Sequence, residues 1–129
     1  MNDETKTITG DNVIYSYTRR EALEDGVLID VSKMAAEAGF RYPVALTAAL
    51  WADINDIPES KSWQDPTGRL WDVLWMGLTS IRGSRTSGSE LVYGLNMPVG
   101  PTTSYSVKLV CGPGDDLEPV ITLMRPDED

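Results

Sequence analysis

The chain has 129 residues, of which 41% are hydrophobic and 24% charged, so it has the composition of a globular domain rather than of a disordered chain. It contains no histidine, which removes the commonest general base and metal ligand, and its single cysteine excludes an internal disulfide. Twenty acidic against eleven basic residues give a net charge of −9, which argues against direct binding to nucleic acid. We therefore expect a cytoplasmic binding protein that is not an enzyme and needs neither metal nor cofactor.

Acidic residues gather toward both ends of the chain, and this divides it into three parts. Residues 1–12 are polar and aperiodic, which predicts a flexible acidic leader without the features of a secretory signal. Residues 13–126 have the pattern of a single globular domain, and residues 127–129 form an acidic tail. No apolar run approaches the ~20 residues that span a bilayer, so we expect no membrane segment.

The first part of the domain alternates short strands with a short helix. The β-branched and aromatic runs at 13–17 and 27–31 predict strands. Between them, Thr18 and Glu21 have the spacing of a capping box that begins a helix, and Gly26 is placed to end it.

Three further helices are expected in the middle of the chain. The first covers 32–38, and Pro43 suits the first turn of a second, which runs over 43–55. The third begins after the N-cap residue Asp65 and ends at about Arg82. We expect this central helix to supply the core, because its apolar residues recur at helical spacing: Leu70, Trp71, Leu74, Trp75, Leu78 and Ile81.

After the central helix the apolar period changes from helical spacing to two. The runs 91–97, 105–111 and 120–124 predict consecutive strands joined by short turns. The fold class is therefore predicted to be α+β, with short strands and helices at the N-terminus and the Trp-rich central helix packed on a C-terminal antiparallel sheet of about three strands.

Clustered carboxylates make the first candidate binding site. Asp115, Asp116 and Glu118 occupy the turn before the last strand, and Asp127, Glu128 and Asp129 end the chain. Concentrated like charges attract a cationic partner, so these six residues are a candidate surface for a protein with a basic groove. The alternative is that they form a turn and a solubilising tail.

A second candidate site combines arginine with an exposed aromatic ring. Trp63 stands in a polar loop, and Arg69, Arg82 and Arg85 could hold an anion such as a nucleotide signal. The segment 82–89 lacks the spacing of a phosphate-binding loop, so a linker is the alternative. Trp71 and Trp75 are expected in the core, although a base-stacking platform is the other interpretation.

The remaining candidates favour structural roles. Cys111 is expected as a buried, inert thiol. Four aspartates lack the spacing of a known cation loop and are better explained as solvated helix caps than as metal ligands: Asp53, Asp56, Asp65 and Asp72. A carboxylate-dependent enzyme is the third and weakest functional hypothesis.

Several segments resemble a family of small uncharacterised proteins, a domain of unknown function found on bacterial plasmids, integrated elements and phages. The segments that carry the resemblance are YSYTR at 15–19, DGVLIDV at 25–31, residues 36–40 and 43–47, GRLWDVLWM at 68–76, and CGPGDD at 111–116 with EPVIT at 118–122. The resemblance implies no catalytic residues. It implies a mobile-element context, in which small acidic proteins often counter host defence and some anti-CRISPR inhibitors mimic DNA with surface carboxylates. The expected partner is thus a host protein with a basic surface, and the oligomeric state stays open.

Overall fold

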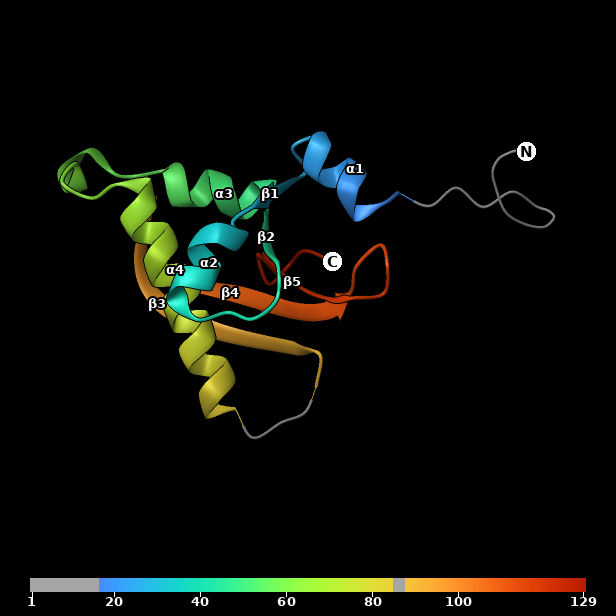
Figure 1. The fold of residues 1–129 in the computed structure, drawn as a ribbon. Coiled ribbons are helices and arrows are strands. Elements are labelled where there is room, and N and C mark those ends of the chain that lie inside the picture. The colour runs from blue at the N-terminus through green and yellow to red at the C-terminus, as the bar shows by residue number, and fades with distance from the viewer. Residues whose placement is uncertain (1–16, 85–87) are drawn as a thin grey trace.

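A five-stranded mixed sheet forms the centre of the part of the chain that the computed structural model describes, residues 17–84 and 88–129 (Figure 1). The strand order is β1-β2-β5-β4-β3. In chain order, the elements are α1 (Arg19–Glu24), β1 (Leu28–Asp30), α2 (Ser32–Ala38), β2 (Val44–Thr47), α3 (Ala48–Asn55), the 3-10 turn η1 (Glu59–Lys61), α4 (Pro66–Gly83), β3 (Glu90–Val99), β4 (Thr102–Pro113) and β5 (Pro119–Met124).

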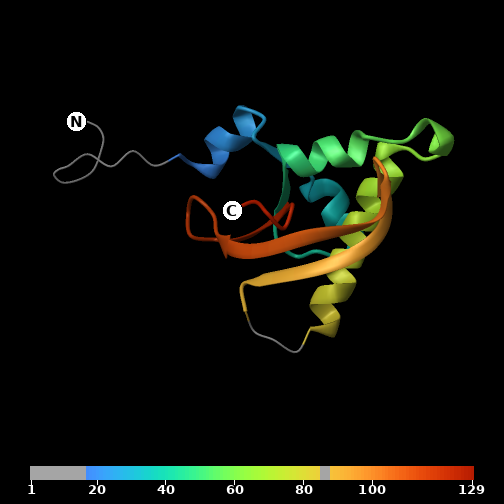
Figure 2. The same cartoon turned by 180° about the vertical axis from the view of Figure 1, so that it is seen from behind.

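The α+β class is confirmed, and so are the three consecutive C-terminal strands. β3 pairs with β4 and β4 with β5, both antiparallel, as a long curved hairpin and its neighbour (Figure 2). The predicted number of about three strands was too low, because β2 adds to β5 in parallel and β1 pairs with β2. The leader at 1–12 and most of the strand predicted at 13–17 lie outside the described residues.

The helix predicted over 43–55 was wrong in its first part. Residues 44–47 form β2 instead, and Thr47 begins α3 by accepting a hydrogen bond from the backbone N–H of Leu50. In a short apolar run, periodicity does not distinguish a buried strand from a helix. Here the partner strand decides, because β5 meets β2 through the backbone of Ile121, whose N–H donates to the carbonyl of Pro43 at 2.9 Å.

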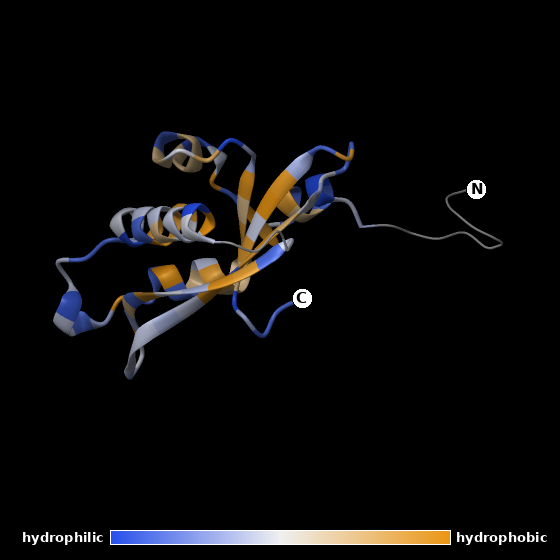
Figure 3. Ribbon diagram, turned by 90° about the horizontal axis from the view of Figure 1, so that it is seen from below, coloured by the Kyte–Doolittle hydropathy of each residue, from blue (hydrophilic) through white to orange (hydrophobic). Residues whose placement is uncertain are grey.

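The main core lies between the sheet and helices α2, α3 and α4. Leu74 and Leu78 of α4 are buried, as the spacing of the central helix predicts, and they join apolar residues from all three helices and from β2 to β5. Figure 3 shows the hydrophobic positions at the centre of the ribbon and the hydrophilic ones in the connections and at the C-terminal end. Burial of these apolar faces is the main stabilising contribution to such a fold.

α1 and the C-terminal residues contact Thr122 and Lys108, which alternate along β5 and β4 with residues of the main core. The Arg19 guanidinium donates to the hydroxyl of Thr122 at 2.8 Å and to the carbonyl of Ile121 at 2.9 Å. The Lys108 ammonium donates to the backbone carbonyl of Glu128. These bonds link both ends of the described chain to β4 and β5.

Gly77 gives α4 its close contact with β3. The buried Tyr93 hydroxyl passes this glycine and donates to the backbone carbonyl of Val73 at 2.7 Å. A methyl group at position 77 would lie 2.8 Å from that hydroxyl oxygen, which is closer than such atoms approach. Burial also raises the pKa of Tyr93, so the hydroxyl keeps its proton and remains a donor.

Replacing Gly77 by alanine should therefore destabilise the protein. We expect the Gly77→Ala variant to lose about 1–3 kcal/mol of unfolding free energy in urea, because the added methyl displaces Tyr93. Gly83 is the matched control, since it ends the same helix with open space around it. Gly83→Ala should leave stability unchanged or raise it by up to about 1 kcal/mol. Equal stability of the two variants would contradict the tight contact.

Candidate functional site

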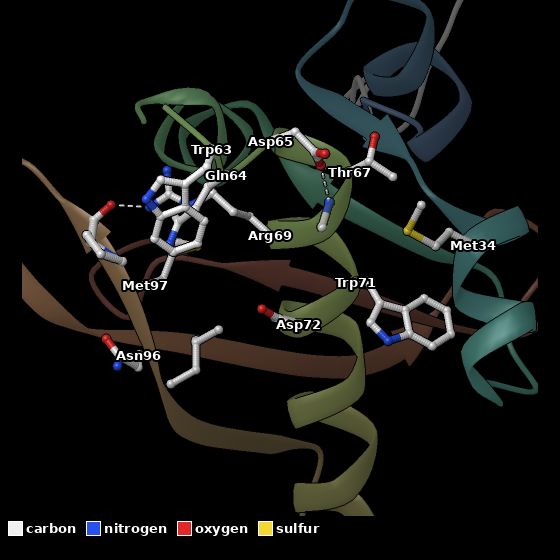
Figure 4. A pocket seen from close by; sticks show the side chains of 13 residues that line it. Met34, Trp63, Gln64, Asp65, Thr67, Arg69, Trp71, Asp72, Asn96 and Met97 are labelled. Carbon is white, nitrogen blue, oxygen red and sulfur yellow. Dashed lines mark hydrogen bonds between the residues drawn. The ribbon is translucent and has the colours of Figure 1, made fainter. Parts of the chain in front are cut away.

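A groove of about 540 Å³ lies around the N-terminal half of α4, and the second half of β3 forms part of its wall (Figure 4). We call it the α4–β3 groove. Figure 4 shows Trp63, Gln64 and Asn96 on one side of α4, and Trp71 with Met34 on the other. The β3 side is lined by Trp63, Gln64, Arg69, Asp72 and residues 95–98.

Arg69 forms the floor of this groove and is 4% exposed. Its Nη1 donates to the carbonyls of Ile54 and Asp56 at 3.3 and 3.1 Å, and its Nη2 donates to the carbonyl of Pro98. Burial lowers the pKa of Arg69, and the nearby carboxylates of Asp56 and Asp53 oppose that effect. The guanidinium of Arg69, which the sequence suggested as an anion ligand, thus donates to backbone carbonyls, and Arg69 has a structural role.

Two buried polar atoms beside the groove have no hydrogen-bond partner among the described residues. They are the Nε of Arg69, a donor, and the Oε1 of Gln64, an acceptor. A buried polar group without a partner is destabilising, so such groups are usually completed by water or a ligand. Both atoms are closed off from solvent, so they lie behind the groove wall and are not presented on its surface.

Trp71 and Trp75 are not core residues, so the expectation from the sequence was wrong. They are 37% and 46% exposed, and their rings stack with centroids 6.4 Å apart and an interplanar angle of 10°. The buried stripe of α4 runs instead through Leu70, Val73, Leu74, Gly77 and Leu78. Each tryptophan follows a buried leucine by one residue, or about 100° around the helix, which moves it to the border of the stripe.

Trp63 is the most exposed tryptophan of the described chain, at 74%. The ammonium of Lys61 lies 5.8 Å from its ring centroid, so one cation is already within reach of the indole. Two carboxylates line the same groove. Asp65 caps α4 by accepting from the N–H of Gly68 at 2.6 Å, whereas Asp72 is exposed and directed from α4 toward β3 (Figure 4).

The other predicted arginines lie outside the groove. Arg82 is exposed at the end of α4, next to Gly39, and is not among the groove residues. Arg85 falls outside the described residues. The structure therefore does not bring Trp63, Arg69 and Arg82 together as a single anion site.

The acidic turn before β5 has a structural function. The carboxylate of Asp115 accepts from the backbone N–H groups of Arg19 and Arg20 at 2.8 and 3.0 Å, which are the first two amides of α1. These bonds lower the pKa of Asp115. Glu118 accepts from the N–H of Asp116 at 2.9 Å, which stabilises the turn itself. Asp115 therefore stabilises the start of α1 while its side chain stays exposed.

The predicted acidic tail is also partly tied to the fold. Glu128 accepts from the hydroxyl of Thr47 at 2.7 Å and from the N–H of Arg125 at 2.8 Å, whereas Asp127 and Asp129 are exposed. Arg125 in turn pairs with Asp53 at 2.8 Å. Burial raises the pKa of Asp53, but hydrogen bonds from Arg125 and Tyr105 outweigh that effect, and the net shift is downward.

The aspartates considered as metal ligands are dispersed. Asp53 pairs with Arg125, Asp65 caps α4 and Asp72 faces the groove. Within residues 17–84 and 88–129, no group of three or more histidine, cysteine, aspartate or glutamate side chains could hold a metal ion. Nor does any helix in that part of the chain combine the length and apolar character needed to cross a membrane.

Comparison with known proteins adds a family but no activity. Residues 4–129 match the model of DUF6573, described as a family of unknown function. No curated protein and no solved structure matches the chain.

The bonds of Asp115 give a pH-dependent prediction. Because its folded-state pKa is lowered, its stabilising effect is present above the ordinary aspartate range and is lost as the pH falls through the folded value. We expect Asp115→Asn to lower the urea midpoint at pH 7, and the difference from the parent protein to shrink in acid. Asp116→Asn is the control, because its exposed side chain lies in the same turn and leaves α1 untouched. A pH-independent difference would contradict this role.

Proposed function

This chain belongs to the DUF6573 family of unknown function, and we propose that it is a non-enzymatic binding protein whose α4–β3 groove takes a basic segment of a partner protein. One observation carries the proposal: Trp63 is 74% exposed at a groove that also presents Asp72. Exposed aromatic rings at a concave surface are the residues that most often dominate the energy of protein–protein contacts.

The chemistry of the groove favours a cationic partner. Asp65 and Asp72 provide negative charge. The indole of Trp63 already has the Lys61 ammonium 5.8 Å from its centroid, which shows that a cation can approach this ring. The net charge of −9 draws a basic partner from a distance and repels an acidic one. The Nη donors of Arg69 are already bonded to carbonyls, so a phosphate finds no free guanidinium fork there.

A small polar ligand is the second candidate. A compact ligand with one acceptor and one donor would complete the Nε of Arg69 and the Oε1 of Gln64, and it would have to displace the side chains that bury these two atoms. The carboxylates favour a neutral or cationic ligand over a nucleotide. Carboxylate catalysis has less support, since a general acid needs a raised pKa. The described aspartates with shifted pKa values, Asp53 and Asp115, are both shifted downward and lie outside the groove.

The resemblance to proteins of plasmids, integrated elements and phages suggests where the basic partner comes from. We infer that the partner is a host protein, and that a nucleic-acid-binding defence complex is the kind of protein that carries such a basic groove. The support is the acidic balance of the chain and the setting of similar proteins, as in anti-CRISPR inhibitors. The acidic turn and tail would then assist by long-range attraction while the groove makes the close contact.

Two groove variants test this function in the native host. We expect Trp63→Ala and Asp72→Asn to weaken retention of the partner, the first by about 30-fold in Kd if Trp63 contributes about 2 kcal/mol. Asp116→Asn is the control, because it removes the same charge at the acidic turn outside the groove. Each variant should fold normally, since Trp63 and Asp72 are exposed. The measurement is affinity capture with all four proteins at two salt concentrations.

The salt dependence separates the contributions. Partner binding should weaken as ionic strength rises, and the Asp72→Asn variant should show a smaller change. Equal capture by the parent, Trp63→Ala and Asp72→Asn proteins would exclude the groove as the binding site. Loss of capture in Asp116→Asn alone would return the site to the acidic turn.

A further inference from the structure

β3 is a long strand at an open edge of the sheet. It has ten residues and pairs with β4 on one side, whereas the opposite edge strand, β1, has three residues. An edge strand presents unpaired N–H and C=O groups, and proteins usually protect long edges with charges, prolines or bulges. From Leu91 to Met97 the strand carries no charged side chain. Pro98 and a register irregularity between Asn96 and Val99 end this segment.

The register identifies which backbone groups point outward. The N–H of Cys111 donates to the carbonyl of Ser89 at 2.8 Å, and Glu90 is aligned with Val110. In an antiparallel pair the residues alternate between bonding the partner strand and facing away from it. Odd-numbered residues of β3 therefore bond β4, and the N–H and C=O groups of Val92, Gly94 and Asn96 face the open edge. Apart from the sheet's own ladder, no backbone hydrogen bond among the described residues reaches them.

The α4–β3 groove reaches the end of this edge, where Leu95, Asn96, Met97 and Pro98 line it. Tyr93 ties β3 to α4 through its bond to Val73, and α4 covers the face of the sheet on which Tyr93 and Met97 are buried. Asp72 projects from α4 toward β3 (Figure 4), and Leu95 and Asn96 of that strand also line the groove. An edge strand beside a helix is an arrangement in which an extended peptide can bind by adding a strand, with alternate side chains directed into the groove.

The charges around the groove favour a basic segment over a second copy of the chain as the ligand of this edge. The groove presents Asp65 and Asp72, β3 begins with Glu90, and the cation of Lys61 lies beside Trp63. The whole chain has a net charge of −9. A second copy would bring these carboxylates against their own equivalents, which is unfavourable. A segment with lysine or arginine would instead place its cations near Asp72 and the indole of Trp63.

We propose that the free edge of β3 accepts an extended basic segment of the partner as an additional strand, bonded to the backbone of Val92, Gly94 and Asn96. This inference rests on the proposed function and states its binding mode. Backbone bonds supply affinity that is independent of sequence. Asp72 and Trp63 select a basic side chain at the positions that face α4.

Hydrogen exchange followed by NMR tests the binding mode on the full chain. The probe is the best-binding peptide from a random decapeptide library displayed on phage. In the free protein, the amides of Val92, Gly94 and Asn96 should exchange fast while those of Leu91, Tyr93 and Leu95 are protected. Saturating peptide should slow exchange of the three outward amides at least tenfold. It should leave the acidic turn at 115–118 unchanged.

Two sets of variants complete the test. Methylating the peptide's backbone nitrogens one at a time should weaken binding about tenfold at every second position and little between them, because only alternate amides bond an adjacent strand. Val92→Pro should weaken binding without disrupting β4 pairing, since the N–H of Val92 faces outward. Val92→Thr is the matched control and should bind normally.

The outcomes separate strand addition from the proposed function. If the peptide binds and depends on Trp63 and Asp72, but neither the outward amides nor alternate methylation respond, strand addition is excluded while the proposed function stands. If library selection yields no peptide that depends on Trp63 or Asp72, both fail. If the outward amides are already protected in the free chain and sedimentation gives twice the monomer mass, the edge binds a second copy and the basic-segment proposal is overturned.

Discussion

The guanidinium of Arg69 joins three parts of the chain that are distant in sequence. From its place in the first turns of α4, it donates to the carbonyls of Ile54 and Asp56 at the end of α3 and to that of Pro98 near the end of β3. Burying a cation is destabilising unless its donors find partners, and these carbonyls satisfy both Nη groups, so they must stay in place for the fold to be stable. The same bonds set the distance between α4 and the end of β3, and hence the width of the groove.

Several of the carboxylates that the sequence singles out stabilise the fold itself. Asp53 forms an ion pair with Arg125, Asp115 accepts hydrogen bonds from the first two amides of α1, and Glu128 accepts one from the hydroxyl of Thr47. Charge composition alone gives no way to separate such internal partners from carboxylates that face solvent. Asp72 is distinguished only by its position, because it is exposed and directed toward the edge of the sheet.

The tryptophans show which part of the exposed surface can be predicted from the sequence. Trp63 was singled out as a contact candidate because it stands in a polar loop, and the structure leaves it 74% exposed. Trp71 and Trp75 were assigned to the core because apolar residues at helical spacing predict a buried face. Periodicity finds that face but not its borders, and aromatic residues at a border remain half exposed. Gln64 carries no signal in the sequence, since its unpartnered oxygen becomes visible only in the folded structure.

The sequence by itself determined the elements whose signals are local. The capping box of Thr18 and Glu21, the Asp65 cap of α4, the buried Leu74 and Leu78, and the three C-terminal strands all follow from spacing within a few residues of the chain. Only the tertiary structure decided the parallel pairing of β2 with β5, the internal roles of Arg69 and Asp115, and the open edge of β3 beside α4. The physical reason is that each of these depends on a partner many residues away. A side chain or strand carries no local mark of which distant backbone group it will bond.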